Sequence, residues 1–100
     1  MKELFSSRAG LQLVDGRAFC RADWPIGRLT LDEQALTLNA LFVSYSIPLR
    51  DVSRIRSQIL TFTIEYRKDG LPKTITVWGW RLFRRLREAA ERNSLNLEFV

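Results

Sequence analysis

The sequence has no histidine, one cysteine and no long apolar run, and each absence excludes a class of protein. Without histidine, and with Cys20 alone, the chain can form neither an intrachain disulfide nor the usual zinc ligand sets, so we expect no metal and no cofactor. No apolar run approaches the roughly 20 residues that span a bilayer. The first residues lack the apolar core of a signal peptide. We therefore expect a soluble, cytoplasmic protein whose membrane contacts, if any, are peripheral at the inner face.

Catalytic motifs are also missing. With no histidine, acid–base chemistry would fall to carboxylates, Lys or Tyr, and the adjacent acidic pair Asp32–Glu33 fits a tight turn better than an active site. Gly27, Gly70 and Gly79 are isolated at expected turns instead of forming a phosphate-binding loop. Cys20 lies on the small apolar face of its expected strand, which favours a buried and inert thiol. We expect a non-enzymatic protein with no small-molecule substrate.

The residues that are present make a single basic domain. The chain has 100 residues, of which 46% are hydrophobic, and this is enough for one core without disulfides. The net charge of +5 favours anionic partners. However, 13 of the 16 basic residues are Arg, and arginine richness also follows genome composition.

A run of short strands followed by one helix is the main pattern. Alternation is clearest over 58–66, where Leu60, Phe62, Ile64 and Tyr66 share the inward face. Extended segments are expected at 11–14, 17–24, 27–31, 34–40, 43–49, 58–66 and 73–79. Turns are expected at Asp15–Gly16, Trp24–Gly27, Asp32–Glu33 and Lys68–Gly70.

The remaining segments complete the expected domain. Residues 1–10 are expected to be a flexible N-terminal segment, and 11–94 form the domain. Residues 50–57 fit either a short strand or a bend. Residues 95–100 alternate weakly and form either a tail or an extra strand.

An amphipathic helix is expected over 80–92. Its apolar residues fall within an arc of about 120°; they are Leu82, Phe83, Leu86, Ala89 and Ala90. The rest of the surface carries Arg81, Arg84, Arg85, Arg87, Glu88, Glu91 and Arg92. Opposite charges four residues apart form three expected ion pairs, Arg84–Glu88, Arg87–Glu91 and Glu88–Arg92. These pairs favour a solvated helix face over a nucleic-acid patch, since a phosphate-binding surface usually leaves its arginines unpaired.

Three stretches carry a resemblance to a known family. They are Gly27-Arg28-Leu29-Thr30-Leu31, then Ala35-Leu36-Thr37-Leu38, then Ser46-Ile47-Pro48-Leu49-Arg50-Asp51-Val52-Ser53-Arg54-Ile55, and a last strand from Lys73 to Gly79 leads into the helix. Over roughly 15–93 the chain resembles a pleckstrin-homology-like (PH-like) domain of the small bacterial and GRAM-related kind. The resemblance implies a barrel of about seven antiparallel strands in two nearly orthogonal sheets, capped by the C-terminal helix. It implies no single function, because the fold carries lipid, peptide and protein contacts alike.

Lipid-binding relatives place basic residues around the first hairpin, and Arg17, Arg21 and Arg28 occupy the matching region. These three are the candidate anionic-lipid contacts, against the alternative of a solvated strand face. The connecting loop Trp24–Gly27 is short, apolar and uncharged, which argues against specific recognition of an inositol phosphate. A general attraction to anionic lipid remains, worth roughly 1 kcal/mol per basic residue near the surface.

Three aromatic residues are candidate partner contacts. Phe19 lies between Arg17 and Arg21 on a charged face, and it either packs under the N-terminal segment or contacts a protein. Trp78 and Trp80 either cap the core at the rim or anchor a partner or membrane interface.

Three hypotheses about function follow. The first is a protein-binding or scaffolding module, with self-association through an exposed strand edge included. The second is peripheral binding to anionic membranes through the first-hairpin arginines. The third is weak nucleic-acid binding, which the paired helix charges and the lack of exposed stacking aromatics on that face disfavour.

Overall fold

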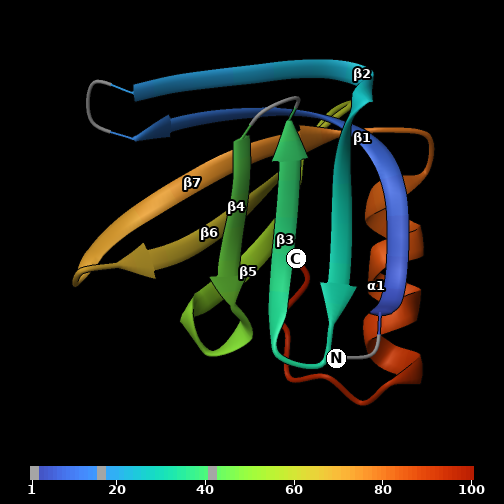
Figure 1. The fold of residues 1–100 in the computed structure, drawn as a ribbon. Helices are drawn as coiled ribbons and strands as arrows, with labels where there is room; N and C mark the ends of the chain where they lie inside the picture. The colour runs from blue at the N-terminus through green and yellow to red at the C-terminus, as the bar shows by residue number, and fades with distance from the viewer. Residues whose placement is uncertain (1–2, 16–17, 41–42) are drawn as a thin grey trace.

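A computed structural model describes residues 3–15, 18–40 and 43–100, and within these ranges the side chains of 13–15, 18–20, 22–25 and 43 lie outside the described part. The fold is mainly β, with seven antiparallel strands and one C-terminal helix (Figure 1). The elements are β1 Glu3–Asp15, β2 Ala18–Asp32, β3 Ala35–Ala40, β4 Val43–Pro48, the 3-10 turn η1 Leu49–Asp51, β5 Val52–Ser57, β6 Phe62–Lys68, β7 Leu71–Trp78 and α1 Leu82–Arg92.

The seven strands form one sheet in the order β4-β3-β2-β1-β7-β6-β5. Two nearly orthogonal sheets were the expectation from the family resemblance, but the strand pairing is continuous. The reason is β1, which pairs with β2 on one side and with β7 on the other. Strands from the two halves of the sheet nevertheless run in different directions, as β3 and β7 do in Figure 1.

Strand β1 differs most from the sequence-based expectation. Residues 1–10 were expected to be flexible and 11–14 to be a short edge strand, yet β1 begins at Glu3 and lies in the middle of the sheet. Ala9 and Leu11 are buried in the core. The polar residues Ser6, Ser7 and Arg8 obscure the alternation of this segment in the sequence. Strand β1 is stabilised by pairing with β2 along most of its length, which the composition of β1 does not suggest.

The expected turn at Trp24–Gly27 is instead an irregularity inside the long strand β2. Ala9 pairs with Gly27 and Leu11 pairs with Ala22, so residue 10 alone faces residues 23–26. A bulge of this kind tolerates Pro25, because a proline cannot donate to a strand ladder. The extra residues bend β2 sharply, as Figure 1 shows.

The middle of the chain agrees with the sequence analysis. The Asp32 carboxylate accepts hydrogen bonds from the backbone N–H of Gln34 at 2.7 Å and of Ala35 at 2.8 Å, so this residue builds the turn between β2 and β3. Of the two alternatives for 50–57, the short strand is confirmed as β5. The turn before β7 is also confirmed, with positive φ values of 54° at Asp69 and 78° at Gly70.

Strand β6 begins four residues later than expected, at Phe62. Its inward residues Phe62, Ile64 and Tyr66 are buried as predicted. Leu60 was predicted to share that face, but it belongs to the preceding turn and is 90% exposed.

Helix α1 lies against β1 and buries one face (Figure 1). Leu82, Leu86, Ala89 and Ala90 are buried, and Phe83 packs partly buried between the rings of Phe62 and Phe99 at centroid distances of 5.8 Å and 5.7 Å. Each buried Leu contributes roughly 1.5–3 kcal/mol. The chain then returns along β5, where Phe99 forms a parallel bridge with Ile55.

Gly10 permits the junction between β1 and β7. It pairs with Trp78 in the sheet, and the indole of Trp78 folds across it. A Cβ atom at residue 10 would lie 2.1 Å from Cε2 of that indole, so a side chain there requires the indole to leave its position.

We predict that Gly10→Ala lowers the free energy of unfolding by about 1–3 kcal/mol, the usual cost of overpacking. In a Trp78→Ala background the clash is absent, and the same change should be neutral or gain about 0.5–1 kcal/mol as alanine replaces a strand glycine. Chemical denaturation of the four proteins measures this coupling. Equal losses in both backgrounds would contradict the packing shown here.

Candidate functional site

The most exposed large apolar side chains gather near one end of the molecule. Ile59 and Leu60, in the turn between β5 and β6, are 91% and 90% exposed, and Trp80, between β7 and α1, is 72% exposed. Single exposed apolar residues are common on proteins, whereas several together mark an interaction surface. We refer to Ile59, Leu60, Trp80 and the adjacent Arg81 as the apolar tip.

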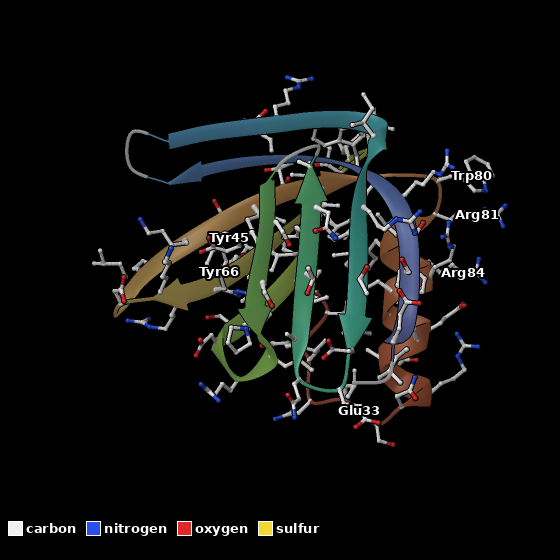
Figure 2. All side chains as sticks on the ribbon, in the orientation of Figure 1. Glu33, Tyr45, Tyr66, Trp80, Arg81 and Arg84 are labelled. Atoms are coloured by element: carbon white, nitrogen blue, oxygen red, sulfur yellow. The ribbon has the colours of Figure 1, made fainter. Side chains whose placement is uncertain are left out.

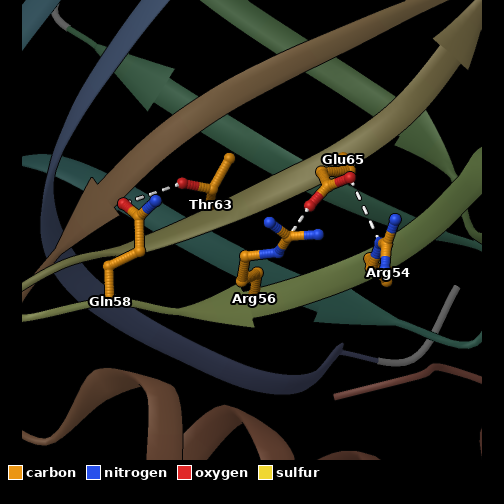
Figure 3. Close-up of polar contacts among 5 residues, drawn as sticks. All are labelled: Arg54, Arg56, Gln58, Thr63 and Glu65. Carbon is orange, nitrogen blue, oxygen red and sulfur yellow. Dashed lines mark hydrogen bonds and ion pairs between the residues drawn. The ribbon is translucent and has the colours of Figure 1, made fainter. Parts of the chain in front are cut away.

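The turn that carries Ile59 and Leu60 is fixed by hydrogen bonds. The backbone N–H of Gln58 donates to the carbonyl of Thr61 at 2.9 Å. The side-chain oxygen of Gln58 accepts from the hydroxyls of Thr61 and Thr63, each at 3.2 Å, and Figure 3 shows the second of these bonds. Gln58 therefore ties the turn to β6 and holds the two apolar side chains in place.

Leu60 has a backbone φ of 67°, a left-handed conformation that normally selects Gly or Asn. For a residue with a side chain this conformation costs roughly 1–2 kcal/mol. The turn thus places a large apolar residue where local chemistry favours a small one, and exposes it to water. Such a conflict with local rules is typical of functional sites.

Trp80 and Arg81 are held on the neighbouring connection. Arg81 also has a positive φ, 51°, at the N-cap position of α1. Its guanidinium carbon lies 5.2 Å from the centre of the Trp80 ring, a cation–π contact. Arg85 donates from Nη1 to the Trp80 carbonyl at 3.0 Å. Figure 2 shows Trp80, Arg81 and Arg84 projecting from the same side of the molecule.

Two shallow hollows join the turn to this connection. One of about 370 Å³ and one of about 530 Å³ share Leu60, Trp78, Gly79 and Arg81 in their walls. The turn and the β7–α1 connection therefore lie side by side. The charged residues that line the two hollows are both basic, Arg81 and Arg84, and the Arg84 guanidinium also pairs with Glu88 at 3.1 Å.

A third hollow, of about 530 Å³, lies between β4 and the β6–β7 hairpin. The hydroxyls of Tyr45 and Tyr66 bond to each other across it at 3.2 Å, and the Lys68 ammonium lies 5.1 Å from the Tyr45 ring. Its walls carry both acids and bases, Asp51, Asp69, Arg67 and Lys68. The walls of this hollow carry charges of both signs and none of the exposed large apolar side chains, so it is the weaker candidate.

The candidate lipid and partner contacts predicted from the sequence do not form one cluster among the described residues. Arg21 is exposed and lies 5.5 Å from the Trp78 ring, and Trp78 is half-buried over Gly10. Arg28 is exposed and donates to the Ser6 hydroxyl at 2.9 Å, so it has a different neighbour from Arg21. Residue 17 and the side chain of Phe19, like that of Cys20, lie outside the described part.

The arginines of α1 and β5 are largely paired. Two of the three expected helix pairs form among the described residues, Arg84–Glu88 at 3.1 Å and Arg87–Glu91 at 3.9 Å. On the sheet, Glu65 binds both Arg54 at 3.2 Å and Arg56 at 3.1 Å (Figure 3). Such exposed pairs contribute little stability, but they reduce the charge available to a phosphate backbone.

The alternating pattern of the sequence did not identify Ile59 and Leu60 as surface residues. Leu60 fits the alternation of inward residues in the strand that follows, because it lies two residues before Phe62. The available signal was the adjacent pair of apolar residues Ile59-Leu60, which breaks the alternation at the point where the strand was assumed to continue.

We predict that Leu60→Gly leaves the free energy of unfolding unchanged or raises it by up to about 1 kcal/mol, because glycine adopts a positive φ without strain. Leu71→Gly is the matched control, since Leu71 is also exposed, at 59%, but lies in a regular strand. It should lose roughly 0.5–1 kcal/mol. Thermal and denaturant unfolding of both variants test this, and a clear loss of stability in Leu60→Gly would contradict the strain.

The stretches that carry the family resemblance lie in regular elements: Gly27–Leu31 in β2, Ala35–Leu38 in β3, and Ser46–Ile55 from β4 through η1 into β5. No protein-family model matches the chain, and no curated protein matches its sequence.

Proposed function

We propose that the protein is a non-enzymatic, PH-like binding module that associates with anionic membrane surfaces through the apolar tip. The observation that supports this proposal is the pair Ile59 and Leu60, nearly fully exposed on a turn held in a strained conformation, beside Trp80 and Arg81. The proposed contact differs from the one that the sequence suggested, which was the first-hairpin set Arg17, Arg21 and Arg28. Of these, Arg21 lies 5.5 Å from the ring of Trp78, a residue that lines the same hollows as Leu60.

The apolar side chains supply the first part of the binding energy. Complete burial of a Leu or Ile side chain contributes roughly 1.5–3 kcal/mol, and both side chains lose nearly all their water when they enter the acyl region. Tryptophan favours the interface between headgroups and hydrocarbon, where its ring is buried and its N–H stays solvated. When Ile59 and Leu60 enter the acyl region, Trp80 reaches the interface, because it lines the same hollow as Leu60.

Charge supplies the second part. Arg81 stands directly beside the apolar side chains, Arg84 lines the same hollow, and the whole chain carries a net charge of +5. Each basic residue near an anionic surface contributes roughly 1 kcal/mol. Attraction of this kind is screened by salt, so binding should fall as ionic strength rises.

A membrane fits the shape of the tip better than a folded protein partner. Ile59 and Leu60 protrude with about nine-tenths of their surface exposed, and a fluid surface accepts protruding side chains without a preformed pocket. No helix in the part of the chain that the structure describes is long and apolar enough to cross a bilayer. The proposed contact is therefore made by loops at the membrane surface.

The PH-like assignment rests on the order of the elements. Seven antiparallel strands are followed directly by a C-terminal helix. Each strand pairs in the sheet with the next strand along the chain, except that β4 and β5 do not pair with each other and form the two edges. The stretch Ser46–Ile55, one of those that carry the family resemblance, connects those two edges through η1.

We expect the protein to co-sediment with vesicles of phosphatidylserine and phosphatidylcholine and to bind weakly to phosphatidylcholine alone. Leu60→Gly should reduce the affinity for the anionic vesicles about tenfold or more, since burial of one Leu is worth at least that factor. Arg81→Glu should reduce it by a similar factor and flatten the salt dependence. The controls are Leu71→Gly and Arg28→Glu, which remove the same groups elsewhere on the surface.

The controls separate the competing hypotheses. Loss of binding in Arg28→Glu combined with Arg21→Glu, with Leu60→Gly unaffected, would assign the membrane contact to the first hairpin instead. Absence of binding to both kinds of vesicle would refute the membrane proposal and favour a protein partner for the same tip.

A further inference from the structure

We propose that residues 95–100 are an exchangeable strand, so that this segment of one copy of the chain docks on β5 of a second copy. In the structure the segment occupies this position within its own chain. The inference does not rest on the membrane proposal, because the contacts that carry it include no residue of the apolar tip.

The segment is held mainly by its backbone. The N–H of Ile55 donates to the carbonyl of Glu98 at 2.8 Å, the N–H of Val100 donates to the carbonyl of Ile55 at 2.9 Å, and the N–H of Ser57 donates to the carbonyl of Val100 at 2.8 Å. These bonds form a short parallel ladder at the edge of the sheet. Backbone ladders of this kind accept an added strand from any chain of suitable pattern.

The side chains of the segment alternate as in a strand. Leu95, Leu97 and Phe99 are half-buried and pack against the core, whereas Asn96 and Glu98 are exposed. The Phe99 ring packs edge-on against Phe83 of α1, with a centroid distance of 5.7 Å and an interplanar angle of 79°. The contacts with β5 and α1 therefore favour an extended segment with an apolar residue at every second position.

The connection to the helix is a defined hinge. The N–H of Leu95 donates to the carbonyl of Ala90 at 3.0 Å and the N–H of Ser94 to that of Glu91 at 3.2 Å, which is the hydrogen-bond pattern of a Schellman motif. That motif places its left-handed residue at position 94, where φ is 53°. Glycine normally fills this position, so serine stores strain in the hinge.

Strain in a short hinge favours exchange. When the segment leaves its own chain, Ser94 relaxes to an extended conformation, while a second copy offers the same β5 and the same Phe83. At low protein concentration the segment docks on its own chain and not on a second copy, because the covalent connection gives it a high effective concentration there. The wild-type chain should therefore be a monomer that exchanges only at high concentration or when the hinge is forced open.

Two substitutions at the hinge test this in the full chain. Ser94→Pro fixes φ near −65° and removes the N–H that bonds to Glu91, so it prevents the closed hinge and should double the mass measured by sedimentation at micromolar concentration. Ser94→Gly relieves the strain and should remain a monomer. In Ser94→Pro combined with Phe99→Ala the mass should return to that of the monomer, because the exchanged segment loses its ring contact.

Three results would overturn the proposal. They are a monomeric Ser94→Pro at concentrations up to several hundred micromolar, a Ser94→Pro dimer that Phe99→Ala leaves intact, and a wild-type dimer that Ser94→Gly does not alter. The third result would instead indicate pairing through the other sheet edge, β4.

If Ser94→Pro fails to fold, a labelled peptide of residues 94–100 serves as the probe. It should bind the full-length Phe99→Ala chain, whose own segment is weakened, at least tenfold more tightly than it binds wild type. Equal binding to the two chains, or no saturable binding to Phe99→Ala, would contradict a shared groove on β5.

Discussion

The rest of the structure depends on the pairing of β1 with β7 at Gly10. Four residue pairs, Gly10–Leu13 against Ile75–Trp78, join the half of the sheet that holds β4, β3 and β2 to the half that holds β7, β6 and β5. At this junction the indole of Trp78 lies over a residue without a side chain, and the bulge of β2 faces the same residue. The position of Trp78 in turn fixes Gly79, Trp80 and Arg81, and hence the start of α1.

Sequence patterns predicted the interior of the elements better than their ends. Alternation identified Phe62, Ile64 and Tyr66 as buried because each faces the core from a regular strand. The same period extends unchanged to Leu60, so it cannot locate the residue at which the strand begins. What decides the boundary is the hydrogen bonding of Gln58 with Thr61 and Thr63, and the sequence does not display these contacts. The candidate site therefore lay in the part of the pattern that periodicity leaves undetermined.

The single continuous sheet was unpredictable for a related reason. Family resemblance and alternation both describe strands one at a time, whereas continuity depends on whether β1 has partners on both sides. Ser6, Ser7 and Arg8 make the start of β1 look like a solvated segment. In the fold, however, the Ser6 hydroxyl accepts a hydrogen bond from the Arg28 guanidinium and forms another with the Thr30 hydroxyl, and both partners lie on β2. Long-range pairing of this kind overrides a weak local preference.

Positive backbone φ values occur at both proposed sites of this chain and at one ordinary hairpin turn. Among the described residues other than glycine, φ is positive at Leu60, Asp69, Arg81 and Ser94. Asp69 precedes Gly70 in a hairpin turn that favours this conformation, so its geometry needs no further explanation. Leu60 and Arg81 both carry side chains of the apolar tip, and Ser94 begins the segment that docks on β5. The last residue of β5 links these features, because Ser57 donates to Val100 and the next residue, Gln58, holds the turn of Leu60. The end of β5 that binds the C-terminal segment is therefore adjacent in sequence to the residue that holds the turn of Leu60.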